Sequence, residues 1–305
     1  MTQTLITSRP YAGAADQAAI IDLVRGRSVD RVDDFPGIID LQEMLGLEEI
    51  QASTHLWEDE EQRLRGYAVL DETNLICEVV PGLGSVLFGQ MVTWAVERLR
   101  LIFHPEGEQP ALEMSCREHD TLWLELLEQQ GFVRQGEGAV HMTRSLRDPI
   151  PEPVLPEGFV IRPVAGEREV AAHVALHRAA WGTENMTVEY RLSMMRTPSY
   201  DRMLDLVAVA PDGRLAAYCM CYISPEANEL SGRQTVYTDP LATHPDFQRQ
   251  GLAKALMLAG MKLLYARGME TARLGTSSDN VAMQKAAEAA GFQLDFRTVR
   301  FAKPL

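Results

Sequence analysis

The sequence lacks long apolar runs and a leader-like start. It has no stretch of about 18 uninterrupted apolar residues, the length that a helix needs to cross a bilayer. We therefore expect no membrane-spanning segment. The first residues, MTQTLITSRP, do not combine a basic start with an apolar core, so we expect no secretory signal and a cytoplasmic location.

Basic residues are in short supply. The 305 residues include 29 Lys and Arg against 43 Asp and Glu, which gives a formal net charge of −14. Such a charge repels nucleic acid and anionic lipid at long range. We therefore expect neither nucleic acid nor a membrane among the partners, and we make no prediction of an oligomeric state.

Cysteine is scarce as well, and metal-ligand patterns are incomplete. The 4 cysteines form no Cys-x-x-Cys pair and lie in apolar, strand-like segments, which is typical of free buried thiols in a reducing compartment. His173 and His177 are four residues apart on an expected helix, but the Glu of the His-Glu-x-x-His signature is absent and no third ligand is evident. We expect no bound metal.

What the sequence does have is a proline-rich break near its middle. Pro149, Pro151, Pro153 and Pro156 exclude both a helix and a central strand. The chain is long enough for two domains of about 150 residues each. We predict domains at residues 1–146 and 159–305, joined by a stiff, extended linker at residues 147–158.

The two halves repeat three landmarks in the same order, which indicates an internal duplication. Ser8-Arg9-Pro10 resembles Ile161-Arg162-Pro163, Leu64–Ala68 resembles Leu215–Cys219, and Gly131-Phe132 resembles Gly291-Phe292. Each half reads as a strand, one or two helices, two or three strands, and then helix, strand, helix and strand. This order predicts an α/β (α+β) fold with a mixed, mostly antiparallel sheet flanked by helices.

A strand, a loop and a helix stand out in the second half. Gln234–Thr243 has strand character, but Pro240 cannot donate to a ladder and predicts a bulge or a free edge. A helix is predicted over Leu252–Arg267, because Leu252, Leu256, Ala259 and Leu263 recur at helical spacing. The loop between them, with Gly251 and Arg249, offers backbone N–H groups and a positive charge, as a pyrophosphate site requires.

The run Gln248-Arg249-Gln250-Gly251-Leu252-Ala253 resembles the Gln/Arg-x-x-Gly-x-Gly/Ala signature of the GNAT acyltransferase superfamily. Asn280 and Gly291-Phe292 resemble the later Asn and the Gly-Phe ending of that family, over about Val160–Phe301. The tandem arrangement is similar to that of mycothiol synthase. The resemblance implies two tandem GNAT-like domains and an N-acyltransferase that uses acetyl-CoA as co-substrate and a small-molecule amine as acceptor.

The resemblance also implies roles for individual residues. The pyrophosphate would rest on the backbone amides of residues 248–253. The pantetheine arm would pair with the backbone of Leu241, Ala242 and Thr243, and the N–H of Leu241 or Ala242 would steady the oxyanion. Asn280 would contact the pantetheine or an adjoining water. In GNAT proteins the segment after the first helix lines the acceptor pocket, so Trp181, Glu184 and Tyr190 are candidates there, with packing or solvated surface as the alternative for each.

Proton transfer is the part for which the sequence departs from the family. Strand alternation predicts Tyr237, Asp239, Leu241 and Thr243 on one face. Tyr237 stands where some relatives carry a catalytic carboxylate, and Asp239 is the better base because a tyrosine with a pKa near 10 is mostly protonated. A purely structural Asp before a proline is the alternative. Ala287 stands where many members have the tyrosine that protonates the leaving thiolate.

The first half keeps the shape of the signature without its chemistry. Gly82-Leu83-Gly84 matches its last three positions, but valines and Pro81 precede them, and His119 is the predicted counterpart of Asn280. We therefore expect a degenerate first domain and one acetyl-CoA site per chain. Two other functions stay open: a catalytically idle acyl-CoA-binding or regulatory protein, which Ala287 favours, and a protein or peptide N-acetyltransferase.

Overall fold

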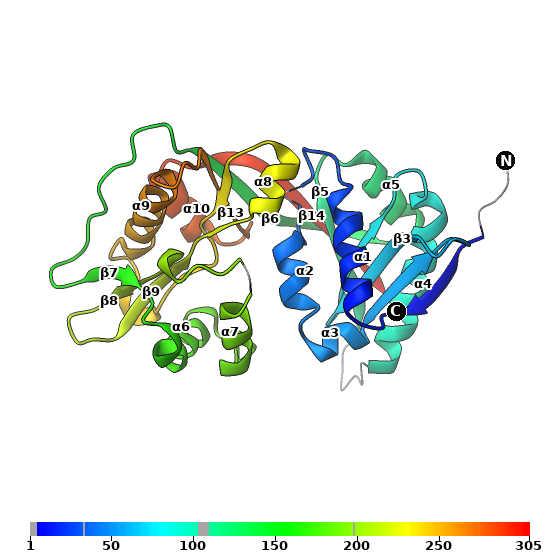
Figure 1. Cartoon of the computed structure of the whole chain (residues 1–305), viewed down its shortest axis with the longest axis horizontal. Coiled ribbons are helices and arrows are strands. Elements are labelled where there is room, and N and C mark those ends of the chain that lie inside the picture. Colours follow the sequence, from blue (N-terminus) through cyan, green and yellow to red (C-terminus); the bar gives the residue numbers. More distant parts are fainter. Residues whose placement is uncertain (1–4, 33, 103–109, 198) are drawn as a thin grey trace. The chain divides into compact units, whose positions relative to one another are not determined.

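The computed structural model describes residues 5–32, 34–102, 110–197 and 199–305 (Figure 1). The chain divides into two compact units, Met1–Gly138 with Arg297–Leu305, and Ala139–Phe296. These bounds differ from the predicted domains, since the last residues complete the first unit and residues 139–146 belong to the second. Residues 147–158 contain neither helix nor strand, and Ile150 and Leu155 pack against the core of the second unit.

The first unit is a sheet with helices on both faces. Across the sheet its strands are β1 (Thr7–Pro10), β2 (Thr54–Glu58), β3 (Leu64–Asp71), β4 (Asn74–Val79), β5 (Ala111–Arg117) and the end of β14 (Gln293–Pro304). The helices are α1 (Ala14–Arg25), α2 (Ile38–Met44), α3 (Glu48–Ala52), α4 (Gly84–Ile102) and α5 (Thr121–Gln129). Alternate residues of β3 pack against α1 on one face and against α4 on the other.

The second unit contains two short sheets. One is antiparallel, in the order β12 (Leu241–Thr243), β9 (Leu215–Met220), β8 (Asp205–Val209) and β7 (Val160–Pro163). The other has the end of β6 (Val133–Ser145), β13 (Thr271–Ser277), β11 (Thr235–Tyr237) and β10 (Tyr222–Ile223). The helices are α6 (Val170–Trp181), α7 (Val188–Met195), α8 (Pro225–Ser231), α9 (Leu252–Tyr265) and α10 (Val281–Ala289). Only the pairs β4–β5 and β11–β13 are parallel among the described pairings, so the predicted fold class is confirmed.

Helix α9 covers one face of the four-stranded sheet. It packs on one face of β8 and β9, and α6 lies on the other (Figure 1). The predicted apolar stripe is right for Leu252 and Leu256, which are buried, and wrong for Leu263, which is 39% exposed. Met261 and Leu264 are buried instead, because the helix is embedded more broadly than a narrow stripe requires.

The duplication predicted from short matches is visible in side-chain contacts. Arg9 donates to Asp16 at 2.8 Å, and Asp16 accepts from the backbone N–H of Ala12 at 2.6 Å. In the second unit Arg162 donates to Glu169 at 2.9 Å, and the same carboxylate accepts from the N–H of Ala165 at 2.6 Å. Each pair ties a first strand to the following helix, and the tyrosines matched on the third strands, Tyr67 and Tyr218, are both buried.

The helices and the cysteines also bear on the composition. No helix within the described residues is both long and apolar enough to span a bilayer. The cysteines are free; Cys116, Cys219 and Cys221 are buried, and Cys77 is half-buried.

Phe301 tests the completion of the first unit by the end of β14. Its side chain is 2% exposed in the core of that unit. Phe301→Ala should lower the free energy of unfolding by about 3–5 kcal/mol, and hydrogen exchange should accelerate at the amides of β5 and α4.

Leu294→Ala is the matched control, because Leu294 lies on the same strand but is 50% exposed. It should change stability by about 0.5 kcal/mol or less. Accelerated exchange confined to α9 and α10 in the Phe301 variant would contradict the strand assignment.

Candidate active site

The strand before the predicted anion loop changes sheets part-way. β11 pairs with β13 in parallel, whereas β12 pairs with β9 antiparallel. Thr238, Asp239 and Pro240 lie between the two strands, and the Asp239–Pro240 peptide bond is cis. The prediction of one strand over Gln234–Thr243 is therefore wrong. Of the bulge or free edge predicted from Pro240, the structure has the free edge, at β12.

β12 forms an edge of its sheet in the part of the chain that the structure describes. The carbonyl of Pro240 and the N–H of His244 both bond to β9, at 3.0 and 2.9 Å. Hydrogen-bonding groups alternate along an antiparallel strand. Ala242 therefore directs its N–H to β9, and Leu241 and Thr243 direct theirs to the open edge. An extended ligand can pair with this edge as an added strand.

The loop after β12 is anchored on one side and exposed on the other. Phe247 is buried, and the Arg214 guanidinium lies 4.6 Å from the centre of its ring. Gln248–Gly251 are exposed, with positive φ at Arg249 (61°) and Gly251 (80°). A Cβ placed on Gly251 would meet nothing within 4 Å. Helix α9 begins at the next residue, and its N-terminus carries about half a positive charge. The exposed backbone amides of residues 248–251 and the guanidinium of Arg249 fit the binding of a pyrophosphate.

The two predicted base candidates lie at the end of β11. Asp239 is half-buried, and its Oδ2 accepts from the Gly275 N–H of β13 at 3.1 Å. Tyr237 stacks on Tyr222, with ring centres 4.6 Å apart. The prediction that Leu241 shares their face is wrong, because Leu241 packs toward the core under α9. The break between the strands reverses the alternation.

Asn280 directly precedes α10, and Ala287 lies within that helix. The Oδ1 of Asn280 accepts from the Met283 N–H at 3.1 Å, so Asn280 caps α10, and it is exposed. Ala287 is fully buried in the apolar core. The contact of Asn280 with pantetheine stays a prediction. Ala287 has no group that could donate a proton to a leaving thiolate.

Comparison with known proteins identifies the fold of this region. Residues 169–292, from the start of α6 to the end of the α10 turn, match the profile of the Acetyltransferase (GNAT) family. The chain therefore contains a GNAT acetyltransferase domain at residues 169–292. The predicted enzyme class, an N-acetyltransferase, is confirmed.

Similarity to known proteins extends over most of the chain. It is 26% identical to the mycothiol acetyltransferase of Acidothermus cellulolyticus, over 87% of this chain and 86% of that protein. A GCN5-related N-acetyltransferase from Sphaerobacter thermophilus has a TM-score of 0.71 at 22% identity and covers 98% of this chain and 95% of its own. A tandem GNAT protein from the clavulanic acid biosynthesis pathway has a TM-score of 0.68 at 15% identity, with 99% and 98% covered. The predicted tandem GNAT-like fold is confirmed.

The predicted acceptor-pocket residues of the GNAT domain have different surroundings. The Nε1 of Trp181 donates to the Tyr218 hydroxyl at 3.2 Å, and Trp181 is 52% exposed. Glu184 forms an ion pair with Arg178 at 2.5 Å, and its side chain is 82% exposed. Tyr190 is half-buried beside the apolar contacts of α6 and α7. Trp181 therefore contacts Tyr218, Glu184 forms an exposed ion pair, and Tyr190 packs between helices.

Tyr218 is the centre of a cluster that sequence reasoning missed. Its hydroxyl lies 2.8 Å from Nδ1 of His177, and its ring centre lies 4.4 Å from that of His173. Burial raises the pKa of Tyr218 to about 12 and lowers the pKa of His173 to about 2. Burial, helped by the charge of Arg191, also lowers the pKa of His177. The phenol and the neutral imidazoles therefore pack together between α6 and β9. No group of three metal-ligating side chains occurs among the described residues.

A buried ion pair holds α7 on the sheet. Arg191 of α7 is 1% exposed and donates to Asp205 of β8, which is fully buried. The Tyr200 hydroxyl donates to the same carboxylate oxygen at 2.7 Å. Burial raises the pKa of Asp205, and the Arg191 guanidinium opposes that shift. The pair fixes the helix that carries Tyr190.

The first unit has a similar backbone arrangement at the place equivalent to the β12 edge and its loop. β4 and β5 pair only at Asn74 and Glu113 among the described residues, so the strands diverge beyond that point. Gly82 has φ 88°, close to the 80° of Gly251, and a Cβ on it would also meet nothing within 4 Å. A cavity of about 670 Å³ follows, lined by Val80, Pro81, Gly82 and Trp123 among others.

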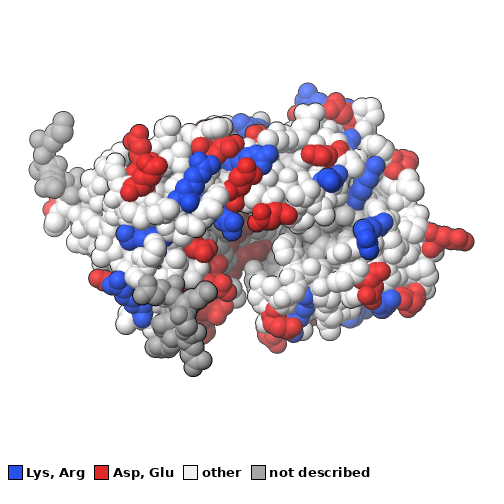
Figure 2. All heavy atoms as spheres, turned by 180° about the vertical axis from the view of Figure 1, so that it is seen from behind, with Lys and Arg blue, Asp and Glu red and all other residues white. Residues whose placement is uncertain are grey.

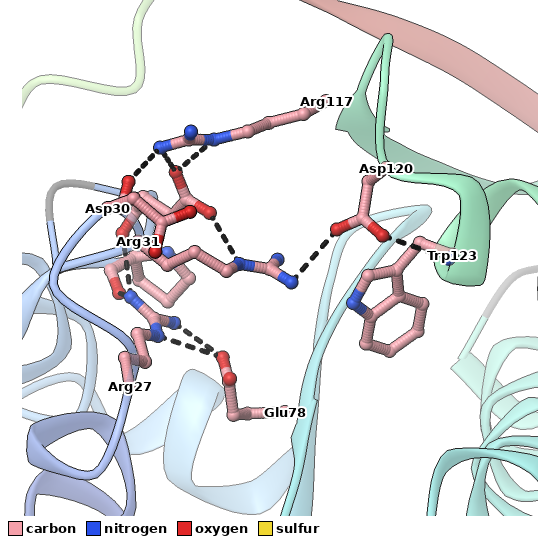
Figure 3. A network of polar contacts seen from close by, with 9 residues as sticks. Arg27, Asp30, Arg31, Glu78, Arg117, Asp120 and Trp123 are labelled. Carbon is pink, nitrogen blue, oxygen red and sulfur yellow. Dashed lines mark hydrogen bonds and ion pairs between the residues drawn. The ribbon is translucent and has the colours of Figure 1, made fainter. Parts of the chain in front are cut away.

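Ion pairs extend across this cavity of the first unit (Figure 3). Arg27 donates to Glu78 of β4 at 2.6 Å. Arg31 pairs with Asp34 at 3.0 Å and with Asp120 at 2.9 Å. The network therefore links β4 to the start of α5. Each of these arginines already has a carboxylate partner.

Asp120 is the counterpart of Asn280. Its Oδ1 accepts from the Trp123 N–H at 3.2 Å and caps α5, as Asn280 caps α10. The predicted counterpart, His119, is wrong by one residue, because only the capping position is fixed by the helix start.

Asp205→Asn tests the buried ion pair. The substitution leaves the Arg191 charge buried without its counter-charge, so the free energy of unfolding should fall by about 3–5 kcal/mol. Denaturation in urea measures it. Glu152→Gln is the control, because Glu152 pairs with Lys262 on the surface and is 83% exposed. Its effect should stay below about 1 kcal/mol, and equal effects of the two substitutions would contradict the account.

Proposed function

We propose that the chain is an acetyl-CoA-dependent N-acetyltransferase for a small-molecule amine, with its active site in the second unit. The observation that carries the proposal is the open edge of β12 directly before the exposed amide loop at the N-terminus of α9. A pantetheine arm needs the first and a pyrophosphate needs the second. Acetyl-CoA supplies the thioester whose carbonyl carbon the amine attacks.

Individual residues have definite tasks in this proposal. The amides of Gln248–Ala253 and the Arg249 guanidinium hold the pyrophosphate. The N–H groups of Leu241 and Thr243 pair with the pantetheine arm. Leu241 is a better oxyanion donor than Ala242, because the N–H of Ala242 is directed to β9. Asn280 remains a candidate contact at the start of α10.

A small acceptor fits the relatives and the surface. Curated relatives that match most of the chain are named mycothiol acetyltransferase, which favours a small molecule over a protein. On the face drawn in Figure 2, basic and acidic side chains are interspersed over the described surface. Together with the net charge of −14, this distribution does not favour a polyanionic partner.

An idle acyl-CoA-binding protein is the second candidate, and Ala287 favours it because its buried methyl replaces a proton donor. Incubation with acetyl-CoA and a panel of amines distinguishes the two. An enzyme releases free thiol only when an amine is present, and mass spectrometry of the amine shows an added acetyl group. Tight acetyl-CoA binding without amine-dependent release would support the idle protein.

Gly251→Asp tests the pyrophosphate loop. The variant places a carboxylate against phosphate and a side chain on a backbone with φ 80°. The affinity for CoA, measured by titration calorimetry, should fall at least tenfold, which is about 1.4 kcal/mol.

Gly82→Asp is a matched control in the first unit, with φ 88° and equal free space. It should leave affinity unchanged, and wild-type protein should bind about one CoA per chain. A second site of similar affinity that survives the Gly251 change would contradict the difference between the units.

A further inference from the structure

The second sheet of the second unit has one face that is not part of the apolar core. Val236, Leu274 and Met142 point into the core with α9. Register and alternation place His141 and Tyr237 on the opposite face, and both are half-buried. This face adjoins the break at Asp239, where the open edge of β12 begins.

His141 and Asp239 both lie beside Gly275 on that face. His141 is the register partner of Gly275. A Cβ placed on Gly275 would lie 3.6 Å from Nδ1 of His141 and 3.8 Å from Oδ2 of Asp239. The glycine thus leaves open a space that both the imidazole and the carboxylate border. The Gly275 N–H, at 3.1 Å, holds the carboxylate.

The imidazole is held as well. Its ring stacks on Phe296, with centres 4.2 Å apart and planes at 12°. β6, which carries His141, precedes the proline-rich segment in the sequence but pairs with β13 of the second unit. His141 therefore belongs to the second unit in space, although it lies in the first half of the sequence.

We propose that His141 is the general base for the acceptor amine and that Asp239 is its positioning residue. The inference rests on the proposed function and deepens it. Asp239 directly precedes Pro240 and Leu241, so the pair lies where the thioester would reach the end of the open edge. Because its Oδ2 is already held by a backbone N–H, Asp239 is suited to orient and stabilise an imidazolium rather than to take the proton itself.

The proton and electron balance is simple. Neutral His141 takes one proton from the substrate ammonium. The freed lone pair forms the N–C bond to the acetyl carbonyl carbon, the C–S bond breaks, and the sulfur keeps that electron pair. The second N–H proton passes to the sulfur, which leaves as a thiol. The imidazolium, held by Asp239, then releases its proton to solvent.

Other charged and titratable groups on this face modulate the pair. Arg273 of β13 lies two residues from Gly275 and opposes protonation of the imidazole, but Asp295 of β14 pairs with it at 3.0 Å. Tyr237 of β11 and Tyr222 of β10 are neutral phenols near pH 7. Asp239 is therefore the group whose removal should move the His141 pKa most.

The first test is the pKa of His141, measured by NMR of histidine-labelled protein, with His141→Asn to assign the signal. Asp239→Asn should lower this pKa by about half a unit or more, because the carboxylate favours the imidazolium. Asp120→Asn is the matched control in the first unit and should leave it unchanged. An unshifted His141 pKa in the Asp239 variant would overturn the pair.

The second test is kinetic. In wild-type protein the acidic limb of the kcat/KM profile should coincide with the NMR pKa of His141, and in Asp239→Asn both should move together. His141→Asn should lose about 10²–10⁴-fold in rate with unchanged affinity for CoA. His119→Asn, an exposed histidine of the first unit, should keep wild-type rates. A His141 variant with wild-type rates, or a limb unrelated to that pKa, would overturn the inference. Wild-type protein that acetylates no amine would refute the proposed function instead, while the NMR shift would still test the pair.

Discussion

The break between β11 and β12 is the constraint on which the site depends. A strand that stayed with β13 would have its N–H groups paired on both sides and would leave nothing for an extended ligand. Because the chain leaves β13 at Thr238–Pro240 and joins β9, one side of β12 stays open. Asp239 supports the break by accepting from the Gly275 N–H across it. The loop to α9 then follows directly from this edge.

The two units show how one backbone can serve different chemistry. Both have diverging strands. In both, a glycine with positive φ precedes the main helix, at 88° for Gly82 and 80° for Gly251. In the second unit, the loop before that helix presents amides and Arg249 to solvent. In the first unit, Pro81 removes a donor, and the arginines near the cavity are paired with Glu78 and Asp120. An anion entering there would have to displace these carboxylates, which is costly for charges with close partners.

Local patterns were readable from the sequence, and long-range register was not. The signature at residues 248–253, the free edge after Pro240 and the repeat anchored on Arg9 and Arg162 each rest on neighbouring residues, and the structure contains them. Strand alternation failed at Asp239, because the chain leaves one sheet there and joins another. The place of His141 beside Gly275 depends on a pairing between residues far apart in the sequence. No local pattern encodes such a pairing, and the same holds for the buried contact of Arg191 with Asp205.

Hydrogen exchange with and without acetyl-CoA tests the central claim most directly, since it reports on the backbone groups that are proposed to bind. The amides of Leu241, Thr243 and residues 248–253 should exchange more slowly when acetyl-CoA is present, and those of the Val79–Gly84 loop should not change. Protection of Val79–Gly84 in place of the β12 edge, or no protection of that edge at saturating acetyl-CoA, would contradict the account.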